Sequence, residues 1–223
     1  MKTKVFNLII VDESGSMHSI RREAFSGMNE TLQTIKTVAQ QNPEMEQRVT
    51  LITFDSTRTK FHYDNAEGLA VVPLNENDYQ PNACTPLYDA IGMGIAKVNA
   101  LVGENDSVLV TIITDGYENS SHEYNLTMIK NLIEKLKKQR WTFTFIGTDD
   151  LDVEGMAHAM GIKNTLSFGR DSEQTRAMFE EEKACRMMWF QRRCKEAQMS
   201  REMSQEPCPT NTDDEQFFDK KHV

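Results

Sequence analysis

The sequence predicts an α/β fold, in which helices cover both faces of a doubly wound, mostly parallel sheet with one antiparallel edge strand. Three observations support this prediction. Apolar runs of strand length alternate with segments whose apolar residues recur every three or four positions, which is typical of parallel sheets connected by helices. Two strand-like segments are separated only by a short turn at Asp55 and Ser56, which favours a hairpin. With 223 residues, the chain can bury a substantial core.

Strands are expected where apolar residues follow one another with almost no interruption. Such runs predict buried strands at residues 4–11, 48–54, 107–114, 141–146 and 164–168. Residues 58–63 alternate between polar and apolar side chains, as a half-exposed edge strand does. Residues 65–82 have no clear period, and Pro73 and Pro81 limit any local pairing there to residues 69–74.

Helices are expected where apolar residues recur at steps of three and four. These stripes predict helices at residues 20–40, 87–101, 128–136, 154–160 and 171–203. The last of these has its own start signal, because Asp171 and Ser172 can cap it and Gln174 can complete a capping box.

These signals divide the chain into three parts. They are an α/β domain at residues 1–170, a C-terminal helix at residues 171–205 that packs on the domain or serves for docking, and a flexible tail at residues 206–223. Residues 187–190 are four consecutive apolar side chains, which cover every side of a helix. They predict either a helix buried on more than one face or a docking surface for another chain.

The composition is that of a soluble globular protein with a formal net charge of −9. This charge argues against binding to nucleic acid, which needs a basic face, and against attraction to anionic membranes. No stretch is long enough to span a bilayer, and the first apolar run ends at Asp12 without a cleavage pattern, so no signal peptide is expected. The four cysteines have no zinc-site spacing and are expected to be reduced thiols of a cytoplasmic protein.

Three separated pieces of the sequence carry oxygen ligands at positions where loops meet one edge of the predicted sheet. Asp12, Ser14 and Ser16 follow the first strand, Thr85 precedes a helix, and Asp115 follows the strand at residues 107–114. Ligands bind beyond the carboxyl ends of the strands in sheets of this type. Alternate residues in extended or turning backbone point the same way, so the oxygens of the first piece can converge on one ion.

The chemistry of these ligands favours a small, hard cation. Three neutral hydroxyls leave the ion strongly electrophilic, and two carboxylates neutralise it, either directly or through a bound water. An octahedral oxygen site of this kind suits Mg²⁺ best, with Mn²⁺ or Ca²⁺ as alternatives. One coordination position is expected to remain for water or for a carboxylate from a partner.

This constellation resembles the von Willebrand factor A domain of bacterial type, with an intact metal-ion-dependent adhesion site. The motif of that family is Asp-x-Ser-x-Ser, then a threonine, then an aspartate, and it corresponds here to Asp12, Ser14, Ser16, Thr85 and Asp115. The resemblance extends over residues 5–168. It implies a Rossmann-like sheet and metal-dependent protein binding.

Four neighbours of the motif are expected to have other roles. Asp89 follows Thr85 by four residues and can act as a capping carboxylate or as an acceptor behind the metal ligands. Tyr117 and Glu118 can line the rim of the site. Cys84 is expected to be a small packed residue.

Two functions remain open at this point. The first is a non-enzymatic module in which the bound metal captures an Asp or Glu side chain of a protein partner. The alternative is an Mg²⁺-dependent enzyme of phosphoryl transfer or hydrolysis, because Asp-x-Ser after a first strand also resembles the start of haloacid-dehalogenase-like phosphatases. Those enzymes need a second aspartate where Ser14 stands, and Glu13, the nearest other acid, is expected to point away from Asp12.

Overall fold

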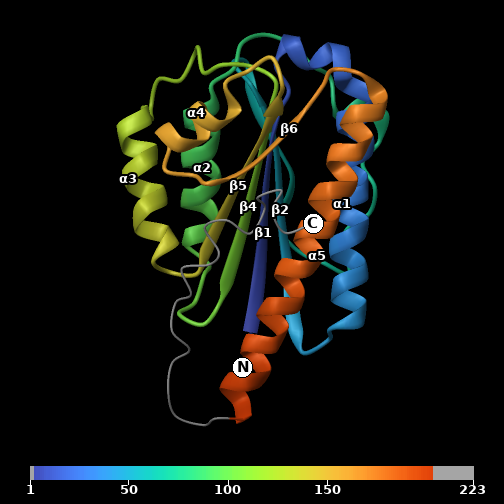
Figure 1. Ribbon diagram of the computed structural model, residues 1–223, viewed down its shortest axis with the longest axis vertical. Helices are drawn as coiled ribbons and strands as arrows, with labels where there is room; N and C mark the ends of the chain where they lie inside the picture. The colour runs from blue at the N-terminus through green and yellow to red at the C-terminus, as the bar shows by residue number, and fades with distance from the viewer. Residues whose placement is uncertain (1–2, 203–223) are drawn as a thin grey trace.

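A six-stranded sheet forms the centre of the computed structural model, which describes residues 3–202 (Figure 1). The strand order is β3-β2-β1-β4-β5-β6. The strands are β1 (Thr3–Asp12), β2 (Met45–Asp55), β3 (Arg58–Glu67), β4 (Ser107–Thr114), β5 (Trp141–Thr148) and β6 (Asn164–Phe168). The helices are α1 (Arg21–Gln41), α2 (Leu87–Asn99), α3 (Leu126–Lys137), α4 (Val153–Ala159) and α5 (Ser172–Glu202), with short 3₁₀ turns η1 (Gly15–Ile20) and η2 (Glu76–Asp78).

All strand pairs are parallel except β2–β3, which is antiparallel. The expected doubly wound sheet with one antiparallel edge strand is thereby confirmed. The side chain of Asp55 closes the turn between β2 and β3, because its carboxylate accepts the backbone N–H groups of Thr57 and Arg58 at 2.6 and 3.1 Å. A turn this short forces the chain to reverse, which explains why β3 is the exception.

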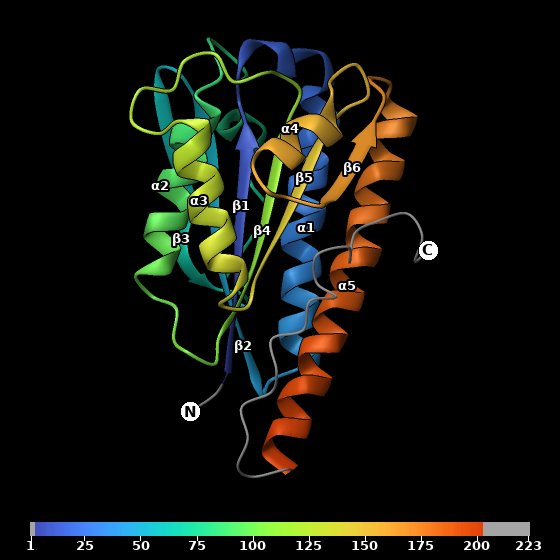
Figure 2. The same ribbon diagram turned by 60° about the vertical axis from the view of Figure 1, so that its left-hand side comes forward.

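The two faces of the sheet are covered by different helices. Helices α1 and α5 lie on one face, and α2, α3 and α4 lie on the other (Figures 1 and 2). Successive side chains of β1 serve the two cores in turn: Val5 and Ile9 pack toward α1 and α5, whereas Phe6 and Leu8 pack toward the other helices. This burial on both faces explains why the central strands appear in the sequence as continuous apolar runs.

Helix α5 begins as its capping signal indicates, with the backbone N–H of Gln174 donating to the Asp171 carboxylate at 2.9 Å. The helix packs against α1 and the sheet, and Trp189 and Phe190 are only 0% and 1% exposed. These two aromatic side chains therefore agree with the first alternative for residues 187–190, a helix buried on more than one face. The sequence that follows is strongly polar, and one of its residues, Arg193, places its Cζ atom 5.1 Å from the centre of the Trp189 ring.

A buried polar network anchors α5 to the sheet. The side chain of Arg186 is 0% exposed and donates to Glu182 of the same helix, to Asn7 of β1 at 3.1 Å and to Thr111 of β4 at 2.8 Å. The indole N–H of Trp189 donates to Thr142 Oγ1 of β5 at 3.0 Å. These directional bonds determine the position of α5 on the sheet more sharply than apolar packing alone can.

Some expectations need correction. Residues 69–74 form no strand, and the Tyr63 hydroxyl instead bonds to the backbone of Val72. Cys84 is exposed rather than packed. Strand β3 continues to Glu67, into a stretch whose sequence lacks a clear period.

The proposed tail at residues 206–223 lies outside the described residues. Within residues 3–202, none of the helices combines the length and the apolar character that crossing a bilayer requires.

Candidate metal centre

The structure brings the five predicted ligands together at the carboxyl edge of the sheet. Strands β1 and β4 are parallel neighbours, so Asp12 at the end of β1 lies beside Asp115, which follows β4. Ser16 Oγ donates to Asp115 Oδ1 at 2.5 Å and lies 3.2 Å from Ser14 Oγ. A methyl group on the nearby Gly116 would lie 3.2 Å from Thr85 Oγ1, 3.5 Å from Ser16 Oγ and 3.8 Å from Asp12 Oδ2.

These distances fit a small cation. Neighbouring ligand oxygens of an octahedral ion with metal–oxygen distances of 2.0–2.1 Å lie about 3 Å apart. The spacings of 2.5 Å between Ser16 and Asp115 and 3.2 Å between Ser14 and Ser16 bracket that value. Over residues 3–202 no three His, Cys, Asp or Glu side chains gather to hold a metal.

Residues that the sequence analysis missed hold the ligands in place. Thr114 Oγ1 donates to Asp12 Oδ2 at 2.6 Å, and Tyr79 donates its hydroxyl to the Asp12 carbonyl at 2.7 Å. Burial raises the pKa of Tyr79 well above 10.0, so the hydroxyl keeps this proton. Two hydrogen bonds join Asn119 to Thr85. The Thr85 N–H donates to Asn119 Oδ1 at 2.8 Å, and the Asn119 N–H donates to the Thr85 carbonyl at 3.1 Å. Thr114 could have been predicted because it stands directly before Asp115, whereas nothing in the sequence places Tyr79 or Asn119 beside the ligands.

Arg170 is the least expected member of the centre. Its Nη1 donates to Asp115 Oδ2 at 2.7 Å and its Nη2 to the Asp115 carbonyl at 3.3 Å. It follows β6, far from Asp115 in the sequence, and only the sheet brings the two together. The carboxylate that the sequence assigns to the metal therefore already has a cationic partner.

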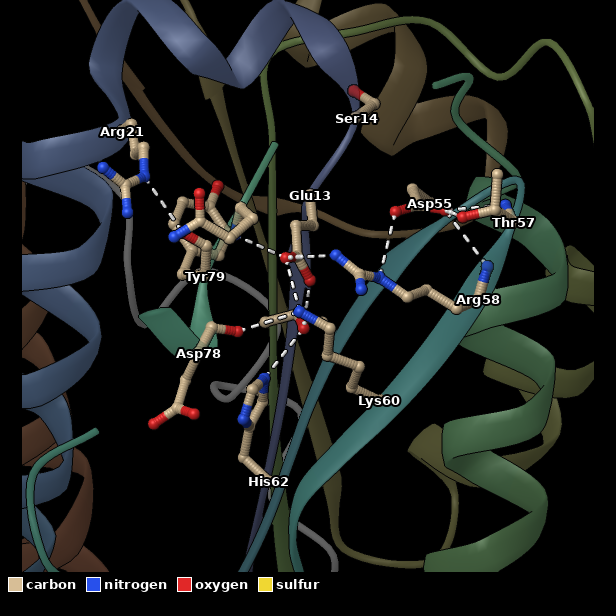
Figure 3. Close-up of polar contacts among 12 residues, drawn as sticks. Glu13, Ser14, Arg21, Asp55, Thr57, Arg58, Lys60, His62, Asp78 and Tyr79 are labelled. Carbon is tan, nitrogen blue, oxygen red and sulfur yellow. Dashed lines mark hydrogen bonds and ion pairs between the residues drawn. The ribbon is translucent and has the colours of Figure 1, made fainter. Parts of the chain in front are cut away.

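Glu13 lies between two ligand residues but faces a different cluster (Figure 3). Its Oε1 accepts Lys60 Nζ at 2.7 Å and the Gln80 N–H at 2.6 Å, with Arg58 Nη2 at 3.5 Å, and its Oε2 accepts Thr53 Oγ1 at 2.6 Å. The expectation that Glu13 points away from Asp12 is thereby confirmed. The cluster ties the first ligand loop to β2, β3 and the loop before α2.

His62 completes this cluster as a neutral group. Its Nε2 lies 2.8 Å from Thr53 Oγ1, whose single proton is already donated to Glu13. The histidine must therefore carry its proton on Nε2 and donate it to Thr53. Burial, followed by the positive charge of Lys60, lowers its pKa below 6.5, which favours this neutral form.

Two acids near the motif have structural roles. Asp89 accepts the backbone N–H groups of residues 122–124 at 2.7–2.9 Å, so it holds the loop before α3 and caps neither α2 nor α3, whose N-cap is Asn125. Glu118 accepts the backbone N–H groups of Tyr88, Ser120 and Ser121 at 2.7–3.0 Å and is engaged within the protein. Tyr117 is 54% exposed and remains available at the rim.

Comparison with known families now gives this arrangement a context. A family model for the von Willebrand factor type A domain matches residues 8–181. The chain belongs to this family. No curated protein sequence matches the chain.

Solved structures share the fold of this VWA domain at low identity. The SpRpn10 VWA domain is 13% identical with a TM-score of 0.55, over 82% of this chain and 95% of that one. The vWF domain of the type V pili tip protein Mfa5 from Porphyromonas gingivalis is 9% identical with a TM-score of 0.57, over 85% and 97%. The PilB minor pilin from Streptococcus sanguinis is 10% identical with a TM-score of 0.53, over 82% of this chain and 61% of the pilin, so the chain corresponds to part of that protein.

Burial leaves the carboxylate of Asp12 poorly solvated in the VWA domain. Its side chain has no exposed surface, and this burial raises the pKa from 3.8 to about 6, against the opposing effect of its hydrogen bonds to Thr114 and Ser14. The folded chain thus binds this proton more tightly than the unfolded chain does. The contribution of Asp12 to stability therefore falls as pH rises from 3.8 to about 6.

We expect Asp12→Asn to stabilise the metal-free domain at pH 7.5, because an amide avoids the cost of burying an ionised carboxylate. A pKa change from 3.8 to about 6 corresponds to at most about 3 kcal/mol. Urea unfolding in chelator at pH 7.5 and pH 4 measures the effect, which should be largest at the higher pH. Asp64→Asn, at a side chain that is 48% exposed, is the control. An Asp12→Asn protein less stable than the wild type at pH 7.5 would contradict the prediction.

Proposed function

We propose that this VWA domain is a metal-dependent protein-interaction module. A divalent cation, most simply Mg²⁺ with Mn²⁺ or Ca²⁺ as alternatives, would be held by Asp12, Ser14, Ser16, Thr85 and Asp115. An Asp or Glu side chain of a protein partner would supply a further ligand. The observation that carries the proposal is the convergence of oxygens from Thr85, Ser16 and Asp12 on the space beside Gly116.

The donor set supports capture of an acid. Hydroxyl oxygens add no negative charge to an ion, so a cation among them keeps a strong attraction for a partner carboxylate. The surrounding chain cannot easily supply that carboxylate, since Glu13, Asp89 and Glu118 all have internal partners. A ligand from another molecule is thus the simplest completion of the site.

The structural neighbours are consistent with a binding role. One is described as the pilus adhesin SpaC from Lactobacillus rhamnosus GG, with a TM-score of 0.58 and 13% identity, and the present chain covers 30% of it. At this identity the likeness supports a shared fold, and adhesion by the neighbour serves only as a precedent for a protein-binding VWA domain.

An enzymatic role is less well supported. Glu13, the acid beside Asp12, is occupied by Lys60 and Thr53 and cannot serve as a base at the candidate metal. Ser14 stands where a phosphatase of the kind considered above needs its acid. We also infer a cytoplasmic protein that binds neither nucleic acid nor membranes, from the net charge of −9 and the free thiols of Cys84, Cys185 and Cys194.

We expect the wild-type domain to bind one Mg²⁺, and Thr85→Val and Asp115→Ala to bind it more weakly. Thr85→Val removes one hydroxyl at nearly constant shape, and Asp115→Ala removes a buried charge, for which the loss is on the order of 2–5 kcal/mol. Titration calorimetry measures both, with Asp64→Asn as a control at an acid outside the centre. Undiminished binding in both ligand variants would refute the assignment.

Partner capture is tested by the same variants. Once a partner is isolated with the wild-type domain in Mg²⁺, its complex should dissociate in chelator. An Asp→Asn or Glu→Gln change in the partner should weaken the complex as much as the chelator does. A complex that persists in chelator would place the docking point elsewhere on the domain.

A further inference from the structure

Arg170 gives the candidate metal centre a positive charge of its own. Its guanidinium touches Asp115 at two points, the side-chain Oδ2 at 2.7 Å and the main-chain carbonyl at 3.3 Å. The Asp115 side chain is fully buried, whereas the Arg170 side chain is 35% exposed. The arginine therefore reaches from the rim of the site to a carboxylate inside it.

The position of this guanidinium is fixed from other sides as well. Its Nε donates to Asp150 Oδ2 at 3.1 Å, and its Nη1 also donates to Ser19 Oγ at 3.2 Å. These contacts come from the loop after β5 and from η1. An arginine held at so many points loses less freedom on pairing with Asp115 than an ordinary surface side chain, and it stays charged at every relevant pH.

Both carboxylate oxygens of Asp115 already have partners within the protein. One oxygen, Oδ1, accepts the Ser16 hydroxyl, and the other, Oδ2, accepts Arg170. A divalent ion that drew on Asp115 would lie close to a fixed guanidinium, and like charges at short range repel. Asp12 and Asp115 balance a divalent ion, and Asp150, which also pairs with Arg170, balances the guanidinium. Arg170 therefore adds no net charge to the loaded centre, and its effect on the metal is its competition for Asp115.

We propose that Arg170 is a positioning residue that competes with the divalent cation for Asp115, which weakens metal binding by the domain. The inference rests on the proposed function. It adds that a metal drawing on Asp115 must share or displace the contact with Arg170, so the domain holds the metal less tightly than its ligands alone would. It also explains why an otherwise unbalanced buried Asp115 is tolerated without metal.

The test compares Arg170→Gln, Arg170→Lys and the wild type, with Arg176→Gln as a matched control. Arg176 is exposed on α5, so this control removes the same charge close in sequence without touching Asp115. Two quantities are measured: Mg²⁺ affinity by calorimetry and thermal stability in chelator and in saturating Mg²⁺. The stability measurement needs no partner and reports on Asp115 directly.

Arg170→Gln is expected to bind Mg²⁺ about tenfold more tightly than the wild type, because a nearby positive charge has been removed. In chelator it should melt at a lower temperature, since Asp115 has lost its counter-charge, and Mg²⁺ should raise its melting temperature by more than it does for the wild type. Arg170→Lys keeps the charge but loses the paired geometry, so a smaller gain of about threefold is expected. If the Arg170→Gln protein does not fold, the Mg²⁺ affinity of the Arg170→Lys protein tests whether Arg170 competes with the metal.

The outcomes separate this inference from the proposed function. If the wild type binds Mg²⁺ and Arg170→Gln binds it no more tightly, competition by Arg170 is overturned while the metal site stands. If only the Arg170→Gln protein binds Mg²⁺, competition is supported but the natural chain is not a metal-dependent module. If neither binds, both ideas fail. A gain equal to that of Arg176→Gln would reduce the effect to general charge and also overturn the inference.

Discussion

Glu182→Ala is expected to destabilise the VWA domain by on the order of 3–5 kcal/mol, because it leaves the guanidinium of Arg186 buried without its carboxylate. Arg186 is fully buried, and Glu182 Oε1 accepts both Nε at 2.8 Å and Nη2 at 2.5 Å. The remaining partners, Asn7 and Thr111, are neutral and cannot balance the charge. Urea unfolding followed by circular dichroism measures the loss.

Two comparisons make this experiment specific. Glu180→Ala, at an exposed acid two positions earlier that pairs with Lys183, should change stability little. The double variant Glu182→Leu with Arg186→Met should recover most of the loss, since replacing both members of a buried pair by apolar groups is often neutral or stabilising. A single variant that unfolds like the wild type would show that solvent reaches Arg186.

Trp189→Ala should cost a similar amount, on the order of 3–5 kcal/mol for a truncated core aromatic. The ring has no exposed surface, meets Phe190 edge-on with ring centres 5.4 Å apart, and bonds to Thr142 on the sheet. Truncation removes all of these contacts at once. Thermal melting measures the effect, and Met199→Ala, at a side chain that is 57% exposed, is the control on the same helix.

The same variant tests the docking alternative for residues 187–190. Light scattering should show the same mass for the wild type and for Trp189→Ala at temperatures where both are folded. A smaller mass in the variant with an almost unchanged melting temperature would mean that Trp189 serves an interface between chains, contrary to its burial against the sheet.

Much of the fold could be predicted from local patterns. The central strands are buried on both faces, so their sequences are continuous apolar runs, and the hairpin is fixed by a short turn at Asp55. Strand β3 was predicted too short because its pairing with β2 continues to Glu67 through an irregular register that local sequence does not reveal. Pairing, rather than propensity, sets the length of such an edge strand.

The candidate site was predictable only in part. Asp12 and Asp115 could be placed together because parallel neighbouring strands end at one edge. The Arg170–Asp115 pair joins residues 55 positions apart, and no motif connects them. The partners of Glu13 on β2 and β3 escaped prediction for the same reason, although the alternation of side chains did show that Glu13 faces away from the ligands.

The bond between Arg186 and Asn7 has a consequence for the order in which the chain folds. It joins positions 179 residues apart, between α5 and β1, which lies at the centre of the sheet. Contacts over such separations form late in folding, because closing the long intervening loop costs conformational entropy before the contact can stabilise the fold. During synthesis the part of the sheet that carries Asn7, Thr111 and Thr142 therefore stays open to water until α5 has left the ribosome.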